Sequence, residues 1–196
     1  GYANKSETNT IASTINLGLE KGKLIALIGE NGIGKSTLLK TLTGIIPPLK
    51  GEVTLLNKSL QSFKPLALAQ ELSIVLTEKL PPSNLTVYEI IALGRQPYTN
   101  WLGSLSKEDT TKIDEAFALT EINHLIHKKH DEISDGQLQI VLIARALAQD
   151  TSIIILDEPT THLDLVHKAT LLKLLRKLAH ETKKTILYST HDIDLA

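Results

Sequence analysis

The sequence contains no cysteine and no methionine among its 196 residues, and only 4% of them are aromatic. Without cysteine the chain can form no disulfide, no thiolate metal site and no cysteine nucleophile, a composition that fits a reducing compartment. No apolar run approaches the roughly 18 residues that span a bilayer, and the start is not typical of a signal peptide. We therefore expect any membrane association to run through a partner. The absence of methionine even at position 1 indicates a fragment or a chain whose methionines were replaced.

The chain also has no excess of positive or negative charge. Lysine and arginine total 21, aspartate and glutamate total 22, and the net charge is −1. This balance gives no electrostatic reason to expect nucleic acid or anionic lipid as a partner. With 42% hydrophobic residues, the chain is long enough for one large domain or for a core with a subdomain.

The most informative segment, residues 29–37, reads Gly-Glu-Asn-Gly-Ile-Gly-Lys-Ser-Thr and fits the phosphate-binding pattern G-x-x-x-x-G-K-[ST]. Its glycines let successive backbone N–H groups point into one concavity, and the helix that follows directs its positive end there. We expect Lys35 to reach the β- and γ-phosphates and Ser36 to hold Mg²⁺. An apolar strand precedes the loop and an amphipathic helix follows it, as this site requires. The nucleotide-binding residues predicted here are Asn31, Gly32, Gly34, Lys35, Ser36 and Thr37.

Strands and helices alternate along the rest of the chain. Strands are expected at residues 24–28, 52–56, 73–76, 152–157 and 185–189, and helices at 35–43, 87–93, 106–119, 134–148 and 165–181. Ser106 followed by Asp109 predicts a capping-box start for one of these helices. The fold class expected is α/β: a P-loop NTPase core with a parallel-rich sheet, a small antiparallel β part and an inserted helical subdomain. We place the core at residues 1–78 and 150–196 and the insertion at 79–149, where it ends in the helix 134–148.

A second acidic motif lies at the end of the strand at 152–157. Four apolar residues, Ile153–Leu156, precede Asp157 and Glu158. A carboxylate at the end of a buried strand is held rigidly, so Asp157 is the candidate Mg²⁺ ligand. Glu158 is the candidate that orients or deprotonates the attacking water. Two acids before the Pro159 turn are the simpler explanation, but the phosphate loop upstream favours a catalytic pair.

Between these motifs, Ile-Ser-Asp-Gly-Gln at residues 133–137 opens the helix 134–148. In this order the motifs resemble the ATP-binding cassette of an ABC transporter, whose signature Leu-Ser-Gly-Gly-Gln precedes the Asp-Glu strand. A serine and a glycine at a helix N-terminus form a second anion site. The resemblance implies that Ser134, Gly136 and Gln137 contact the γ-phosphate bound by a second copy of the chain.

The resemblance extends over essentially the whole chain and assigns further residues. Thr-His-Leu-Asp at 161–164 lies where the family has its D-loop, and His191 lies at the switch histidine. Tyr2 lies where the family stacks an aromatic ring on adenine. The implied catalytic residues are therefore Lys35, Glu158 and His191, and the implied cofactors are ATP and Mg²⁺.

The sequence departs from the family pattern at two positions. Thr77 stands where the family has a glutamine that senses Mg²⁺ or the attacking water, and Glu78 follows it. The Thr77 hydroxyl is shorter than a glutamine side chain but remains a candidate metal-side ligand. The signature carries Asp135 where glycine is usual, and a carboxylate there would repel a γ-phosphate unless it points away. We therefore assign Asp135 no contact with nucleotide.

Residues 85–98 resemble the cassettes of importers that take up iron–siderophore complexes, haem or cobalamin. In that family this region faces the membrane subunits, and Tyr98, Trp101 and Leu102 fit an exposed apolar contact patch. The alternative is that Trp101 and Tyr98 pack the core of the insertion. His124, His127 and His130 recur every three residues, but the lysines between them favour a solvated stretch over a metal site.

The function implied is that of an ATPase motor subunit. Two copies enclose two ATP molecules and pass their motion to integral membrane permease subunits, and indirectly to a substrate-binding protein. The location implied is cytoplasmic, at the inner face of the cell membrane. One alternative is a soluble ABC-type ATPase acting on nucleic acid or ribosomes, although no lysine-rich arm or heptad repeat is present. A P-loop kinase or GTPase is disfavoured by the signature motif and by the lack of Asn-Lys-x-Asp.

Overall fold

A four-stranded parallel sheet forms the centre of the computed structural model, which describes residues 1–3, 8–77, 81, 83–161 and 163–193. The strands are β1 (Tyr2–Ala3), β2 (Thr8–Asn9), β3 (Leu24–Ile28), β4 (Thr54–Leu55), β5 (Lys58–Ser59), β6 (Leu72–Val75), β7 (Ile153–Leu156) and β8 (Thr185–Thr190). The helices are α1 (Lys35–Leu42), α2 (Pro65–Glu71), α3 (Val87–Ala92), α4 (Lys107–Thr120), α5 (Asp135–Ala148) and α6 (Leu165–Thr182). In the sheet the order is β3-β8-β7-β6, while β1 pairs with β2 and β4 with β5 in two small antiparallel pairs. The expected α/β class, with a parallel-rich sheet, a small antiparallel part and a helical region, is confirmed.

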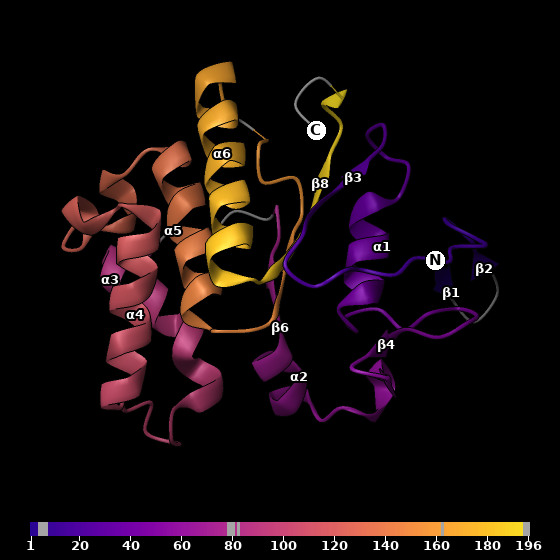
Figure 1. The fold of residues 1–196 in the computed structure, drawn as a ribbon, viewed down its shortest axis with the longest axis horizontal. Coiled ribbons are helices and arrows are strands. Elements are labelled where there is room, and N and C mark those ends of the chain that lie inside the picture. Colours follow the sequence, from indigo (N-terminus) through magenta and orange to yellow (C-terminus); the bar gives the residue numbers. More distant parts are fainter. Residues whose placement is uncertain (4–7, 78–80, 82, 162, 194–196) are drawn as a thin grey trace.

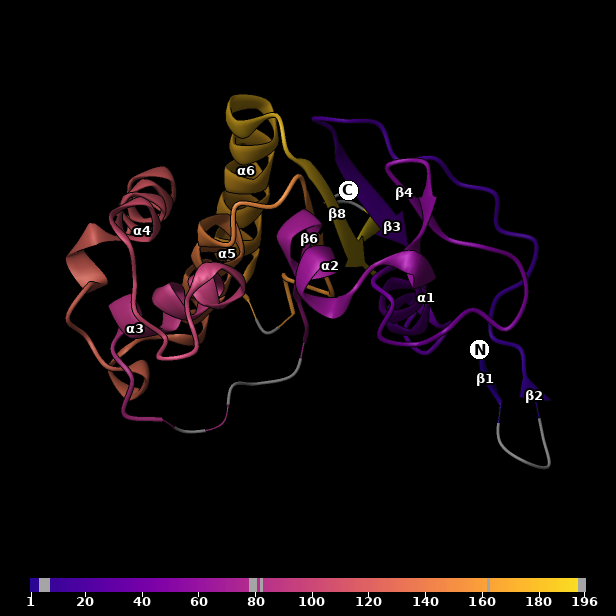
Figure 2. The same ribbon diagram turned by 90° about the horizontal axis from the view of Figure 1, so that it is seen from below.

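The two faces of the sheet pack against different helices, because successive side chains of a strand point to opposite sides. Ile154 and Ile186 face the cluster that contains the buried residues of α5 and α6. Ile155 and Leu187, each one position along, pack with Leu39 of α1 on the other face. Figures 1 and 2 show the result, with α1 on one side of the sheet and α5 and α6 on the other.

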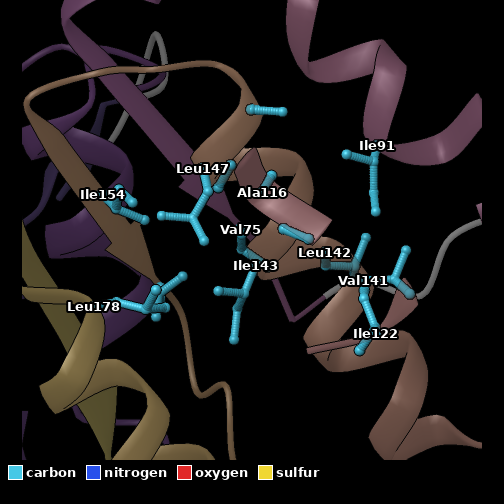
Figure 3. Packing of buried hydrophobic residues seen from close by; sticks show 14 of the residues in the cluster. Val75, Ile91, Ala116, Ile122, Val141, Leu142, Ile143, Leu147, Ile154 and Leu178 are labelled. Atoms are coloured by element: carbon cyan, nitrogen blue, oxygen red, sulfur yellow. The ribbon is translucent and has the colours of Figure 1, made fainter. Parts of the chain in front are cut away.

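The helices between β6 and β7 share their core with one face of the sheet. Figure 3 shows Val75 and Ile154 of the sheet in the same cluster as Val141 and Ile143 of α5 and Ile91 of α3. All five side chains are at most 1% exposed. This continuous packing fixes α5 relative to the sheet edge. The division into a core and an insertion at residues 79–149 stays a prediction.

A buried ion pair holds the segment after α3 in place. This segment is a 3-10 helix, Leu93–Tyr98, that extends the helix predicted to end at residue 93. Arg95 Nε donates to Asp109 Oδ1 over 2.8 Å, and Arg95 Nη1 donates to the carbonyl of Ala148 over 2.8 Å. Asp109 also completes the predicted capping box with Ser106. A side chain at Gly94 would collide with the carbonyl of Arg145, so this tight packing requires glycine.

Several element boundaries differ from those predicted. The strand predicted over residues 52–56 is wrong in length, since only Thr54–Leu55 is paired. Leu56 and Asn57 both have positive φ, 51° and 60°, and form the two-residue turn into β5. The strand predicted at 73–76 lies one residue earlier, at Leu72–Val75. None of the helices in the part of the chain that the structure describes is long and apolar enough to cross a membrane.

Candidate nucleotide-binding site

All four parallel strands end at one edge of the sheet, and each is followed by a predicted site residue. The phosphate loop follows β3, Asp157 and Glu158 follow β7, His191 follows β8, and Thr77 lies two residues after β6. Because the strands are parallel and neighbouring, these segments converge at the carboxyl edge, where open α/β sheets bind their ligands. Sheet order therefore brings together residues that are more than 100 positions apart.

The phosphate loop has the backbone that its glycines allow. Gly32 and Gly34 have φ of 81° and 106°, in the left-handed region that favours glycine. Lys35 begins α1 directly after Gly34, so the positive end of this helix lies at the loop. A side chain at Gly34 would collide with Ile11, which places Ile11 against the loop. Sequence reasoning missed this contact, and no motif around Ile11 signals it.

Lys35 is buried and held by three groups. Its side chain is 5% exposed, and its Nζ donates to the carbonyls of Gly29, over 2.8 Å, and Glu30, over 3.0 Å. The same Nζ lies 3.0 Å from Oε1 of Glu158. The two predicted catalytic residues thus form an ion pair. A triphosphate that binds in this loop competes with Glu158 for the lysine, because both are anions that seek the same cation.

Glu158 is constrained from several sides. Its backbone has a φ of 46°, and the Thr161 hydroxyl donates to Oε2 over 3.1 Å. Burial alone raises the pKa of this carboxyl group, but the hydrogen bond and charge of Lys35, with help from Thr161, hold the pKa below its ordinary value. Glu158 is therefore an ionised carboxylate at neutral pH, which is the form that accepts a proton.

Asp157 is 4% exposed, and its carboxylate accepts hydrogen bonds from two hydroxyl groups. Ser36 Oγ donates to Oδ1 of Asp157 over 3.0 Å, and Ser189 Oγ donates to the same oxygen over 2.8 Å. The Ser189 oxygen also accepts the backbone N–H of Glu158 over 2.8 Å. Ser189 is a site residue that the sequence analysis missed, since a lone serine in a buried strand carries no signal.

This arrangement fits Mg²⁺, which prefers oxygen ligands and one or two carboxylates. Ser36 and Asp157, predicted as metal ligands from separate motifs, are in direct contact. The third candidate, Thr77, uses its hydroxyl to donate to the carbonyl of Asp157 over 2.9 Å. Thr77 therefore lies beside the candidate metal ligands, joined to the backbone of one of them. Glu78 lies outside the described residues.

His191 lies at the same edge but is held less closely. Its Nδ1 is 3.7 Å from Oε2 of Glu158, and its Nε2 is 3.9 Å from Oδ1 of Asp192. Both distances exceed that of a hydrogen bond. The ring thus faces the acid that it is predicted to work beside.

The signature residues lie at the start of α5, which packs on the face of the sheet opposite to α1. Ser134 caps α5: its hydroxyl accepts the N–H of Gln137 over 3.2 Å, and Gln137 Oε1 accepts the N–H of Ser134 over 3.0 Å. A side chain carbon on Gly136 would lie at ordinary contact distance, 3.5–3.6 Å, from Leu163 and His167. The two capping bonds occupy the backbone N–H groups of Ser134 and Gln137 within the chain, and the second anion site at this helix start stays a prediction.

Two predicted positions remain untested. Tyr2 lies in β1, but the described side chains do not include its ring, so adenine stacking stays a prediction. His162 of the D-loop lies outside the described residues. Tyr98 is partly covered by Arg95, which lies 3.9 Å from its ring centroid, whereas Trp101 and Leu102 are 91% and 66% exposed. The latter two therefore do not pack the core of the insertion.

Comparison with known proteins agrees with this geometry. Residues 12–161 match the family model described as ABC transporter. An uncharacterised ABC transporter ATP-binding protein of Methanocaldococcus jannaschii is 44% identical over 196 residues, which cover all of this chain and 66% of the relative. The iron(3+)-hydroxamate import ATP-binding protein FhuC of Bacillus subtilis is 38% identical over 196 residues, which cover all of this chain and 71% of the relative. The chain thus spans about two thirds of the length of these relatives.

A solved structure extends the likeness to the fold. The dimeric structure of the bacterial ABC transporter cassette MJ0796 superposes with a TM-score of 0.82 at 30% identity, over all of this chain and 86% of that one. The phosphate loop, the acidic strand end and the capped signature helix occur here in the order and places that the family resemblance implies. The chain therefore belongs to the ABC transporter family, as an ATP-binding cassette.

Proposed function

We propose that this chain is the ATP-hydrolysing subunit of an ABC importer that takes up a metal chelate such as iron–siderophore, haem or cobalamin. The observation that carries the ATPase assignment is the contact of the phosphate-loop residues with the acidic strand end, Lys35 with Glu158 and Ser36 with Asp157. The cargo class rests on the segment after α3 and on the similarity to the iron(3+)-hydroxamate import protein.

Each residue of the site has a separate role in ATP hydrolysis. Lys35 binds the β- and γ-phosphates, leaving Glu158 as it does so. Glu158, released from the lysine, accepts a proton from the water that attacks the γ-phosphorus, while the bond from that phosphorus to the β,γ-bridging oxygen breaks and ADP leaves. His191, 3.7 Å from Glu158, donates a hydrogen bond toward the γ-phosphate. Ser36 and Asp157 would hold Mg²⁺, which supplies charge neutralisation at the phosphate oxygens.

Two copies are needed to complete the site in this proposal. The phosphate loop precedes α1 on one face of the sheet, while Ser134 and Gly136 begin α5 on the other face. In a two-fold pair, the signature of each copy can close over the nucleotide held by the other. The relative MJ0796 is dimeric, which supports this arrangement. The pair would work at the cytoplasmic face of the cell membrane, bound to permease subunits and served by a substrate-binding protein.

Trp101 and Leu102 supply a surface for the permease. Trp101 is 91% exposed, and a large apolar side chain in this position is typical of an interaction site. The buried pair of Arg95 and Asp109 fixes the 3-10 helix, Leu93–Tyr98, that precedes it. We therefore expect the patch to be presented rigidly.

Replacing Trp101 by aspartate should separate the chain from its permease without impairing its fold. The exposed ring makes few internal contacts, so the melting temperature should stay within about 2 °C of wild type. Co-purification with the permease, and ATP-dependent uptake of a ferric hydroxamate into proteoliposomes that hold the complete complex, should fall at least roughly tenfold. Basal ATPase activity of the isolated chain should be unchanged.

The matched control is Ile45→Asp, which charges a 53% exposed apolar residue just after α1, on the opposite side of the sheet. Uptake with this variant should equal wild type. If neither variant affects uptake, the patch is not the permease surface. If the chain purifies with nucleic acid or ribosomes instead of a permease, importer function is wrong.

A substitution at Thr77 tests separately what this residue does beside the candidate Mg²⁺ ligands. Thr77→Gln restores the residue type usual in the family, but it removes the hydroxyl that bonds the Asp157 carbonyl. ATP affinity should stay within about threefold, because the Thr77 contact is to the backbone of Asp157 and not to the phosphate loop. Turnover, or its stimulation by the permease, should change instead, since in the family the contact of this glutamine with Mg²⁺ or the attacking water forms on closure. Isothermal titration and steady-state ATPase assays measure the two. A large affinity change with unchanged turnover would contradict this assignment.

A further inference from the structure

Asp192, the residue after His191, forms an ion pair with a lysine of α6. Lys168, in the first turns of α6, places its Nζ 2.5 Å from Oδ2 of Asp192. Both side chains are sheltered, at 21% and 29% exposure. The pair joins α6 to the segment after β8, across 24 residues of sequence.

His191 lies between two fixed points along the chain. Before it, Thr190 ends β8 and its carbonyl accepts the N–H of Gly29 over 3.2 Å. After it, Asp192 is held by Lys168 and donates its own N–H to the Thr190 hydroxyl over 3.1 Å. The imidazole nitrogens themselves are 3.7 Å and 3.9 Å from their nearest acidic oxygens. The ring is therefore oriented by its backbone and by Asp192 more than by direct bonds of its own.

The base of this attachment is rigid. α6 begins at a capped N-terminus, where Asp164 accepts the N–H of His167 over 2.9 Å, and it buries Leu171, Leu175 and Leu178 against the sheet. The Lys168 hydrogen bond lowers the pKa of Asp192 below its ordinary value. Asp192 is thus ionised at neutral pH and stays a charged acceptor for the lysine.

We propose that Lys168 is a positioning residue for ATP hydrolysis, which holds His191 in line with Glu158 by anchoring Asp192 to α6. This proposal rests on the proposed ATPase function. An ordinary surface ion pair contributes little to the stability of a protein. Here the pair fixes Asp192, the residue that follows His191 along the chain just after β8, so loss of the pair frees the ring to leave the γ-phosphate.

The test compares the neutral variant Lys168→Met with Lys168→Arg, which keeps the charge. We expect Lys168→Met to lower kcat about tenfold, below the roughly 100-fold cost of displacing a reacting group by 1 Å. KM for ATP should stay within about twofold, because Lys35 and the loop bind the ground state. Lys168→Arg should recover most of kcat. Asp192→Asn should match Lys168→Met, and the double variant should be no worse than either single one, since both act through one contact.

Lys177→Met is the matched control. Lys177 is another α6 lysine in an ion pair, 2.8 Å from Glu121, away from the site. Its kcat should equal that of wild type. The proposal is overturned if Lys168→Met behaves like Lys177→Met, if arginine gives no rescue, or if the effects of Lys168→Met and Asp192→Asn add as independent changes.

A second measurement keeps the proposal testable even if the chain hydrolyses no ATP, which would count against the proposed function alone. In histidine-selective NMR spectra of the full chain, Lys168→Met should shift or broaden the His191 ring signals, while Lys168→Arg and Lys177→Met should leave them in place. An unchanged His191 signal in Lys168→Met would refute the positioning role.

Discussion

Replacing Lys35 by alanine is expected to abolish detectable ATP binding. In the structure this side chain is buried at the start of α1, where the backbone of the phosphate loop and Glu158 surround its Nζ. Hydrogen bonds to charged groups contribute about 1.5–3 kcal/mol each, so the loss of contacts to the β- and γ-phosphates should raise Kd by about 100-fold or more. Removal of the lysine also leaves the Glu158 carboxylate uncompensated beside the triphosphate, and the two effects act in the same direction.

A loss of binding must be separated from a loss of fold. Lys35→Met keeps the aliphatic stem that fills the buried space, and its melting temperature and circular dichroism report whether the loop still folds. Lys40→Ala changes a lysine on the same helix beyond the loop and should bind ATP like wild type. Isothermal titration with ATP measures all three. An affinity of Lys35→Met within threefold of wild type would show that the lysine does not meet the phosphates.

The local motifs were readable from sequence because each depends on neighbouring residues. The phosphate loop needs glycines and a lysine at fixed spacing, and the capping box at Ser106 needs only residues three positions apart. α2 was missed although Pro65 opens it, the position at which proline favours a helix. At seven residues, its apolar pattern is too short to show a period.

The contacts between motifs could not be read in the same way. Lys35 and Glu158 meet because β3 and β7 both lie beside β8, and no local pattern specifies that order of strands. For the same reason Ser189 and Lys168 escaped notice. Each is an ordinary residue of a strand or helix, and only the tertiary fold places Ser189 on Asp157 and Lys168 on Asp192.

Glu158→Gln is expected to bind ATP but to hydrolyse it roughly 10²–10⁴ times more slowly, which is the usual contribution of a positioned base. The amide keeps the shape of the side chain and can still accept from Thr161, but it cannot take a proton from water. The structure adds a second expectation. Without the carboxylate, the triphosphate no longer competes with Glu158 for Lys35, and no negative charge at this position repels it. ATP affinity should therefore be equal to or tighter than that of wild type.

The same variant should change how stability depends on pH. The pKa of Glu158 is below its ordinary value, so the folded state favours the ionised form. The stabilisation that this gives is present above the pKa of the unfolded chain and is lost as the pH falls through the lower pKa of the folded chain. Wild type should therefore be more stable than Glu158→Gln at neutral pH, and the difference should shrink in acid. Chemical denaturation at a series of pH values between 7 and about 3 measures it.

Slow hydrolysis with retained binding should also trap the two-copy state. With ATP and Mg²⁺, Glu158→Gln should sediment as a dimer, because in the proposed pair the signature on α5 of one copy closes over the nucleotide bound by the other and no hydrolysis reopens the pair. Without nucleotide it should sediment as a monomer. Glu108→Gln, which removes an exposed acid in the first turn of α4, should hydrolyse ATP like wild type and show no such trapping. If Glu158→Gln hydrolyses ATP at the wild-type rate, Glu158 is not the base. Slow turnover without an ATP-dependent dimer would keep Glu158 as the base and contradict the second-copy contact of Ser134 and Gly136.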